Sequence, residues 1–363
     1  MNSAKQALHL GVVGPLPPPA GGMATQTRQL VNLLGDEQVD VTLVQNNKPY
    51  RPKWIENVKG FRALFRLMPY LFDVWRLAGK VNVIHLMANS GWSWQLFSAP
   101  VVWIGWFKKT PVIVNYRGGE AQSYFERSFR WVSPTLKKAS LIVVPSGYLK
   151  KVFADFGLET QVISNIVDLE RFKPASTKPL KPVFKLIITR NLEIIYGIET
   201  AIKATAIAKE KVPDLCLEIA GTGPQQEALE KLVEKLGLQQ QITFVGRLDA
   251  QQIVEFYQSA NIMLNPTTVD NMPNSVLEAL ACGVPVITTD VGGIPFIVEH
   301  EKTAMMVPVG DEVAMAGQIV SLYQNGDIRE SLVLNGLDAV QPYAWPCVKG
   351  LWIDLYHELK VIK

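Results

Sequence analysis

The sequence predicts an α/β protein made of two doubly wound, parallel-sheet domains. Three observations support this: the length, two series of short apolar runs that alternate with amphipathic stretches, and a proline-rich interruption between the series. The chain of 363 residues has room for two domains of about 150 residues each. Apolar runs separated by helical periodicity are typical of βαβ units, whose parallel strands are buried.

The apolar runs predict the strands of each domain. The first series lies at 10–13, 39–44, 81–86, 112–116 and 141–144. The second lies at 184–189, 215–220, 242–245, 262–265, 286–288 and 305–307. Segment 168–182 holds three prolines and no apolar periodicity, so we expect an inter-domain linker with the boundary near residue 175. The predicted domains are therefore 1–175 and 176–342.

Two further predictions concern a last helix and the place of a ligand site. Apolar residues recur at helical spacing over 345–361, which indicates a last helix that packs on another element. Ligands of open parallel sheets bind at the carboxyl ends of the strands. We therefore expect two facing sheets with a ligand cleft between the domains.

Composition excludes several classes of protein. Thirty-six basic and 33 acidic residues leave a net charge of +3, which gives no reason to expect a nucleic-acid partner. The three cysteines form no CxxC pair, so we expect reduced thiols, no zinc site and a cytoplasmic protein. No signal peptide is indicated. The longest apolar stretch, 91–107, contains Pro100 and is short for a membrane span, which favours a buried or interfacial helix.

The first candidate site is the turn after the first predicted strand. Gly21 and Gly22 stand just before a helix predicted to start near Met23. Paired glycines let backbone N–H groups approach an anion, and the helix dipole favours a phosphate at that end. A proline-stiffened surface loop would explain the same residues. The turn lacks the GxGxxG pattern of dinucleotide folds, which argues against a dehydrogenase.

The second candidate site follows strands of the second domain. Arg190 and Asn191 come directly after a strand, and Asp270 lies on a loop that leads into a helix capped near Asn274. Glu278 lies about one turn inside that helix. A carboxylate there suits two vicinal hydroxyls, while Arg190 supplies a planar cation for a diphosphate. Together they predict a sugar-nucleotide clamp; taken singly, Asp270 fits a turn and Glu278 complements the helix dipole.

Four segments give the chain a resemblance to a known family. They are 164–174 (SNIVDLERFKP), 217–230 (LEIAGTGPQQEALE), 242–248 (ITFVGRL) and 270–293 (DNMPNSVLEALACGVPVITTDVGG). In this order they resemble, over nearly the whole chain, the retaining nucleotide-sugar glycosyltransferases of the GT-B fold, family four of the glycosyltransferase classification. The last segment is similar to the E-x7-E element of that family, with Asp270 and Glu278 at its acidic positions.

The resemblance implies roles for the second domain, which would bind the nucleotide sugar. Glu278 would hold the nucleotide ribose, and the helix N-terminus at Asn274 and Ser275 would help to hold the diphosphate. The hydroxyls of the transferred sugar would be held by Asp270, Asn271, Met272 and Pro273. The residues near the nucleotide and its phosphates would be Arg190, Asn191, Gly221, Gly223 and Arg247.

The resemblance also implies roles for the first domain, which would lie on the acceptor side. Gly21 and Gly22 would approach the donor phosphates or the acceptor. A terminal helix within 343–363 would return to complete this domain. The family usually has a lysine five residues after the clamp arginine, but Arg190 is followed by Ile195 and Tyr196, so the lysine is missing. Arg117, near the place of a first-domain histidine in many members, would replace that cation or contact the acceptor.

The activity implied by the resemblance is hexose transfer with retention. The donor would be a UDP- or GDP-hexose, and the acceptor a saccharide or a lipid-linked molecule, in the synthesis of a bacterial surface polysaccharide or glycolipid. We expect no further cofactor and no metal, because the chain has no DxD motif. Two alternatives remain: a non-catalytic sugar-nucleotide-binding or scaffold protein, which the missing lysine would fit, and a sugar-nucleotide epimerase of the same fold.

One basic segment suggests a further partner. Segment 53–80 carries six basic and two acidic residues, and its apolar residues between 61 and 75 fall on one helical stripe. Such a helix could lie on an anionic membrane surface, with the protein peripheral on the inner face of the cytoplasmic membrane. A helix that joins the core of the first domain, kinked at Pro69, would explain the same pattern.

Overall fold

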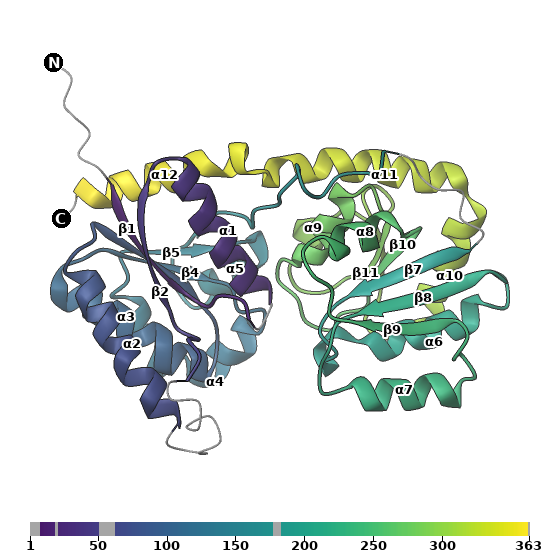
Figure 1. Ribbon diagram of the computed structural model, residues 1–363, viewed down its shortest axis with the longest axis horizontal. Helices are drawn as coiled ribbons and strands as arrows, with labels where there is room; N and C mark the ends of the chain where they lie inside the picture. The colour runs from purple at the N-terminus through teal and green to yellow at the C-terminus, as the bar shows by residue number, and fades with distance from the viewer. Residues whose placement is uncertain (1–7, 19–20, 51–61, 177–182, 362–363) are drawn as a thin grey trace. The chain divides into compact units, whose positions relative to one another are not determined.

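The chain forms two compact units (Figure 1). The computed structural model describes residues 8–18, 21–50, 62–176 and 183–361. Unit 1 comprises residues 1–166 and 345–363, and unit 2 comprises residues 167–344. Each unit has its own six-stranded sheet, and every pair of neighbouring strands within each sheet is parallel.

The sheet of unit 1 has the strand order β2-β1-β3-β4-β5-β6. Its strands are β1 His9–Gly14, β2 Asp40–Gln45, β3 Val83–Ala88, β4 Val112–Tyr116, β5 Leu141–Val144 and β6 Gln161–Val162. Its helices are α1 Gly22–Asp36, α2 Arg62–Ala78, α3 Ala99–Lys108, α4 Ala121–Leu136, α5 Gly147–Asp155 and α12 Trp345–Val361. A π-helical turn, Trp94–Ser98, precedes α3.

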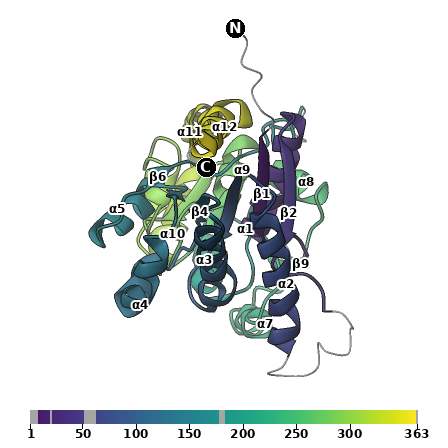
Figure 2. The same cartoon turned by 90° about the vertical axis from the view of Figure 1, so that its left-hand side faces the viewer.

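Helices cover both faces of this sheet (Figure 2). Side chains that alternate along the strands divide between two apolar clusters, as expected for strands buried on both faces. One cluster joins the sheet to α2, α3, α4 and α5, and the other joins it to α1 and α12. Trp352 and Tyr356 of α12 are fully buried there, so the last helix belongs to the core of unit 1.

The sheet of unit 2 has the strand order β12-β11-β10-β7-β8-β9. Its strands are β7 Phe184–Thr189, β8 Leu215–Ala220, β9 Ile242–Gly246, β10 Ile262–Asn265, β11 Val286–Thr289 and β12 Met305–Val307. Its α-helices are α6 Ile198–Ala208, α7 Gln226–Lys235, α8 Gln252–Gln258, α9 Asn274–Ala281, α10 Glu312–Gln324 and α11 Gly326–Val340. One apolar cluster includes α6, α7 and α10, and the other includes α8 and α9.

The structure confirms the predicted α/β class and the two doubly wound sheets. All eleven runs predicted as strands coincide with strands to within two residues at either end. Strand β6 was missed, because its two residues form too short a run to show alternation. Helix α12 spans the predicted range. Stretch 91–107 became the π-helical turn and most of α3.

Part of the segment expected to be a linker is packed on unit 2. Val167 N donates to Tyr343 O over 2.9 Å, and Phe172 is buried against Tyr257. Val167, Phe172 and the partly buried Leu169 belong to one apolar cluster of unit 2. The prolines of the segment predicted a linker, although its first part is anchored by these side chains. The predicted boundary near residue 175 therefore lies inside unit 2, eight residues after its start at Val167.

The described residues include no helix long and apolar enough to cross a membrane. Helix α2, expected as one apolar stripe, presents apolar residues on two sides. Tyr70, Val74 and Leu77 are buried in the core, whereas Phe65 and Phe72 are exposed. Residues 53–61 of the basic segment lie outside the described part of the chain.

Candidate functional site

The predicted clamp residues gather at the carboxyl edge of the unit 2 sheet. Arg190 directly follows β7, and Asn265 is the last residue of β10, the neighbouring strand. Gly221 follows β8, on the other side of β7. Because the strands are parallel, these residues all lie at the edge where open α/β sheets bind their ligands.

Arg190 and Asp270 form an ion pair at this edge. Their side chains retain only 12% and 13% of their exposure, so little water screens the pair. Arg190 also donates from Nε and Nη2 to Asn265 Oδ1, over 3.0 and 2.8 Å. Asn265 in turn donates to Thr288 Oγ1 over 2.9 Å. The guanidinium, expected to supply a cation for a diphosphate, is thus held by a carboxylate and an amide through its Nε and Nη2.

Tyr196 packs on the same guanidinium, with Arg190 Cζ 4.9 Å from its ring centroid. The turn that carries Tyr196 is held by the loop after β10, because Thr268 N donates to Ile195 O over 2.8 Å. Gly197 has φ of 58°, and a Cβ there would lie 2.0 Å from Pro266 O. An aromatic ring therefore lies one residue after the position where the resemblance led us to look for a lysine, and it supports Arg190 by a cation–π contact.

Glu278 lies on α9 and accepts a hydrogen bond from Tyr257 Oη over 3.0 Å. Tyr257 Oη is also within 2.8 Å of Thr189 Oγ1, at the end of β7. Burial raises the pKa of Glu278 to about 7, although the Tyr257 hydroxyl and the charges of Arg171 and Arg190 oppose that rise. Glu278 is therefore a carboxyl group that changes charge near neutral pH, and it responds electrostatically to the Arg190 cation.

Gly221 and Gly223 have a structural reason to be glycine. A Cβ at Gly221, where φ is 145°, would lie 1.9 Å from Arg190 O, and a Cβ at Gly223 would lie 2.4 Å from Leu192 O. The two loops are joined by Leu192 N, which donates to Thr222 O over 3.2 Å. The glycines thus let the loop after β8 lie directly against the backbone that carries Arg190.

A second glycine pair positions the acidic loop. Cβ atoms at Gly292 and Gly293 would lie 2.1 Å from Asp270 O and 1.8 Å from Asn271 O. Gly293 N donates to Asp270 O over 3.0 Å. The loop after β11 therefore supports Asp270 and Asn271 from behind through backbone contact.

The helix cap differs from the prediction. Asn274 is the first residue of α9, its N-cap is Pro273, and no side chain caps the helix. The following Ser275 is buried, and its Oγ has no hydrogen-bond partner among the described residues. Pro273 cannot supply the side-chain oxygen of a normal cap, so the positive end of α9 is without one.

The remaining unit 2 residues of the prediction are more peripheral. Asn271 and Met272 lie in the same loop as Asp270, and both side chains are buried. Asn191 donates to Glu193 Oε1 over 3.3 Å, beside Arg190. Arg247 is exposed just after β9 and is not joined to the Arg190 cluster by any contact found in the described chain.

Unit 1 places its three candidates at the carboxyl edge of its own sheet. Gly21 is the N-cap of α1, with extended backbone, no side-chain cap and open space around the position of its absent Cβ. Gly22 begins α1. Arg117 follows β4 and donates to Asn165, and its Nε has no partner within the described ranges. Burial lowers the pKa of Arg117 to about 10, so it stays a cation at neutral pH.

His85, on β3, is a core residue. It lies 2.7 Å from Tyr356 Oη through Nδ1 and 3.0 Å from Asn115 Nδ2 through Nε2. Burial and the nearby Arg117 charge lower its pKa to about 3, so the ring is neutral at physiological pH. His85 is therefore a histidine of the core with both ring nitrogens in contact with polar side chains.

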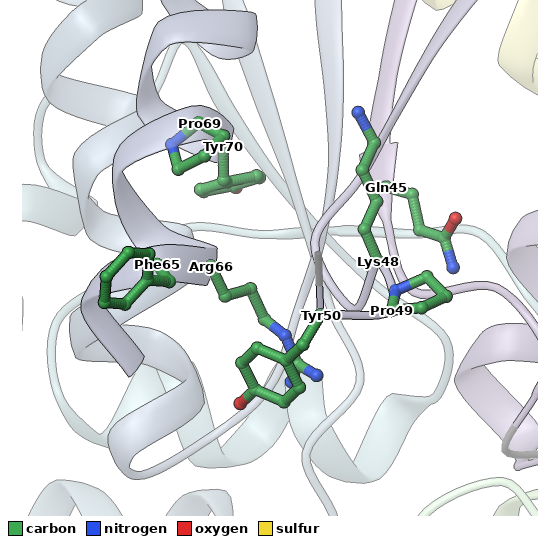
Figure 3. Close-up of a pocket in the computed structure, with 8 residues that line it drawn as sticks. All are labelled: Gln45, Lys48, Pro49, Tyr50, Phe65, Arg66, Pro69 and Tyr70. Carbon is green, nitrogen blue, oxygen red and sulfur yellow. The ribbon is translucent and has the colours of Figure 1, made fainter. Parts of the chain in front are cut away.

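A cavity of about 440 Å³ lies elsewhere in unit 1 (Figure 3). One wall comes from the end of β2 and the residues after it, and the other from the N-terminal half of α2. Arg66 projects into the space between them, with its Cζ 4.0 Å from the ring centroid of Tyr50. The described residues contain no group of three or more His, Cys, Asp or Glu that could hold a metal ion.

Sequence reasoning missed three residues of the unit 2 cluster as site residues: Asn265, Tyr257 and Tyr196. Asn265 carried a signal, since it is the one polar residue in the strand IMLN and ends it at the ligand edge. Tyr257 carried none, because a tyrosine on an amphipathic helix fits an ordinary core position.

Profiles of two glycosyltransferase families match adjoining parts of the chain. The profile of Glycosyltransferase Family 4 matches residues 20–171, and that of Glycosyl transferases group 1 matches residues 170–338. A 2-deoxystreptamine N-acetyl-D-glucosaminyltransferase of Niallia circulans is 29% identical over 161 residues. That match covers 44% of this chain and 41% of the relative, so this chain spans less than half of the relative's length.

Solved structures show the same fold. Sucrose-phosphate synthase from Thermosynechococcus elongatus superposes with a TM-score of 0.79 at 20% identity, over 98% of this chain and all of that one. Anabaena HepE, solved in complex with UDP-glucose, superposes with a TM-score of 0.75 at 16% identity, over 96% and 99% of the two chains. The chain has the GT-B fold and belongs to glycosyltransferase family four, the glycosyl transferases group 1.

Proposed function

We propose that the protein transfers a hexose, with retention of configuration, from a nucleotide sugar to a saccharide or lipid-linked acceptor. One observation carries the proposal: Arg190, Asp270 and Glu278 converge at the carboxyl edge of the unit 2 sheet, where Arg190 pairs with Asp270 and acts electrostatically on Glu278. Family membership and a structural relative solved with UDP-glucose support a UDP- or GDP-hexose as the donor.

Each group in unit 2 has a role in holding this donor. Glu278, in its charged form, accepts hydrogen bonds from the two ribose hydroxyls. Asp270 and the loop of Asn271, Met272 and Pro273 hold the hydroxyls of the sugar. The diphosphate lies at the uncapped N-terminus of α9, where the orphan hydroxyl of Ser275 can donate to it.

The reaction breaks the bond between the sugar anomeric carbon and the phosphate oxygen. The acceptor hydroxyl attacks the anomeric carbon from the same face, and its proton passes to the departing phosphate oxygen. Arg190 and the backbone N–H groups of α9 stabilise the growing charge on the diphosphate. The chemistry requires no protein base and no metal, and the acceptor binds on unit 1 near Gly21, Gly22 and Arg117.

The acceptor and pathway belong to the proposal as well. Arg117 is a half-buried cation whose Nε is buried, and no carboxylate pairs with it in the described chain, so an acceptor that carries negative charge fits this edge of unit 1. Lipid-linked intermediates of bacterial surface polysaccharides and glycolipids have that chemistry.

The direct test is a thermal-shift panel of UDP- and GDP-hexoses followed by calorimetry with the best donor. A donor that binds only the folded protein raises the melting temperature of the protein. Glu278→Ala should lose most donor binding and turnover, because the ribose acceptor is gone. Glu234→Ala, at an exposed position of α7, is the matched control and should behave as wild type.

The outcomes separate the alternatives. Unchanged donor affinity in Glu278→Ala contradicts the site. Donor binding without transfer to any saccharide or lipid-linked acceptor would favour a non-catalytic binding protein, and conversion of the donor without an acceptor would favour an epimerase. Loss of activity on treatment with EDTA would contradict the metal-independent mechanism.

A further inference from the structure

Helices α2 and α3 of unit 1 carry large apolar side chains on their outer sides. On α2, Phe65, Met68, Phe72 and Trp75 are all between 42% and 60% exposed. Their spacing of three and four residues places them on one side of the helix. The core side of the same helix is formed by other residues, including Tyr70 and Val74. The four exposed side chains are therefore not part of the hydrophobic core of unit 1.

The outer side of α3 continues this surface. Trp103, Trp106 and Phe107 are between 40% and 67% exposed, whereas Val101, Val102 and Gly105 of the same helix are buried. Helices α2 and α3 lie side by side (Figures 1 and 2), and the rings of Trp75 and Phe107 are 5.6 Å apart. We call the seven exposed residues of α2 and α3 the aromatic face.

Cations lie directly on this face. Lys108 Nζ is 4.0 Å from the ring centroid of Trp75, Lys138 Nζ is 4.4 Å from that of Trp106, and Arg76 Cζ is 5.6 Å from that of Phe72. Lys109 and Lys137 are their neighbours in sequence. The described part of α2 and the whole of α3 contain one acidic residue, Asp73, and Lys48 neutralises it over 2.7 Å.

Two kinds of occupant could cover an apolar face, and the charges distinguish them. A second copy of the chain would bring like cations together around a shared apolar contact, which is unfavourable. An anionic bilayer complements both features at once, since tryptophan and phenylalanine rings enter the boundary between headgroups and acyl chains while lysine and arginine remain with the phosphates. Monomeric proteins rarely expose so many large apolar side chains together without a partner.

We propose that the aromatic face docks unit 1 on the surface of an anionic lipid bilayer. Helix α2 follows β2 and runs back along the sheet, so its N-terminal half lies at the carboxyl edge with the cavity of Figure 3. Arg66 lines that cavity, and its Nε is buried without a hydrogen-bond partner in the described residues. The aromatic face therefore adjoins a cavity that contains basic side chains. This cavity lies at the carboxyl edge of the unit 1 sheet, where a substrate from the membrane would arrive.

The test is co-sedimentation of the full chain with vesicles. Wild type should sediment with phosphatidylcholine vesicles that contain phosphatidylglycerol, less with pure phosphatidylcholine, and less again at high salt. Phe72→Ser, at a 60% exposed position, should weaken partitioning about tenfold. Leu334→Ser, at a 59% exposed position on α11 of unit 2, is the matched apolar control and should leave it unchanged.

Charge is tested by a second pair of variants. Lys108→Glu should weaken partitioning by about tenfold or more, because reversal removes one attraction and adds one repulsion. Lys235→Glu, exposed on α7 of unit 2, is its control. Melting temperatures close to wild type show that each variant is folded.

Three outcomes would overturn the proposal. The first is wild type that fails to sediment with anionic vesicles. The second is equal loss in the variants and in their controls. The third is a concentration-dependent dimer in vesicle-free solution that Phe72→Ser abolishes, which would assign the aromatic face to a second copy of the chain.

Discussion

The structure around Glu278 acts on the pKa of its carboxyl group in two opposite directions. Burial raises its pKa to about 7, and the hydrogen bond from Tyr257 lowers it. Because ribose binding uses the carboxylate, donor affinity should increase as the pH rises through 7. Tyr257 is a positioning residue in this arrangement, since it acts on the donor through Glu278.

Replacing Tyr257 by phenylalanine should move this pH dependence. Without the hydroxyl, the charged form of Glu278 loses a bond worth about 1.5 to 3 kcal/mol, so the midpoint should rise by about one pH unit or more. Donor affinity measured by calorimetry at several pH values gives the midpoint. Thr189→Val removes the neighbouring hydroxyl but leaves the Tyr257 bond to Glu278, so its midpoint should shift less. Equal midpoints in wild type and Tyr257→Phe would contradict the positioning role.

Tyr196 offers a second test at the residue scale. Its ring supports Arg190, and an exposed to partly buried cation–π contact contributes about 0.5 to 2 kcal/mol. Tyr196→Leu should therefore weaken donor binding by a factor of about two to thirty while the fold is retained. Calorimetry with the donor measures the loss. Tyr323→Leu, at the ring that packs on Phe184 away from the cluster, controls for a general loss of aromatic packing in unit 2.

At the scale of elements, glycines let the loops of the unit 2 site pack directly against one another through their backbones. Gly221 and Gly223 bring the loop after β8 against Arg190 and Leu192, and Gly292 and Gly293 bring the loop after β11 against Asp270 and Asn271. The sequence showed these glycines, but it gave no means to tell a glycine that approaches a sugar from one that approaches another loop.

Gly293→Ala should disturb the acidic loop. Its Cβ would lie 1.8 Å from a backbone oxygen, which cannot rotate away, so we expect a loss of about 1 to 3 kcal/mol in the free energy of unfolding and weaker donor binding. Gly317→Ala is the control: it lies inside α10 with no atom near the new Cβ, and should stabilise unit 2 by about 0.5 to 1 kcal/mol. Denaturant unfolding measures both changes, and a neutral Gly293→Ala would show that the two loops can separate.

Strands were predictable and side-chain partners were not, for a physical reason. A buried parallel strand must be a short apolar run, so β7 and β10 could be recognised from their own residues. Arg190 and Asp270 were recognised as site residues, but their mutual ion pair depends on the adjacency of β7 and β10, which no local pattern records. In helix α2 the predicted stripe is present, but a second apolar side was missed. Tyr70, Val74 and Leu77 also recur every three or four residues, and spacing alone does not show which row faces the core.

At the scale of the molecule, acid should destabilise unit 1 through one buried histidine. Unit 1 buries neutral His85, whose pKa is lowered to about 3. In the unfolded chain a histidine takes up its proton near pH 6.5, so this contribution to stability is complete above that pH and is lost as the pH falls toward 3. Once His85 is protonated in the unfolded chain, it lowers the free energy of unfolding by about 1.4 kcal/mol for each pH unit of acidification.

His85→Gln should flatten the acid side of the stability curve of unit 1. Thermal unfolding at several pH values between neutral and acid measures the slope. His357→Gln, at a partly exposed position of α12, is the control and should retain the wild-type slope. If both variants follow the wild-type curve, burial of His85 does not contribute to the acid sensitivity of the protein.

Helix α12 gives the two units an unusual order of completion during translation. All residues of unit 2 are synthesised before Trp352 and Tyr356, yet these side chains fill the core of unit 1. Domains generally fold in the order of synthesis, N-terminal first. Here synthesis of the second unit ends first, so one face of the earlier sheet is covered by α1 alone, and stays partly open to chaperones, until α12 has emerged.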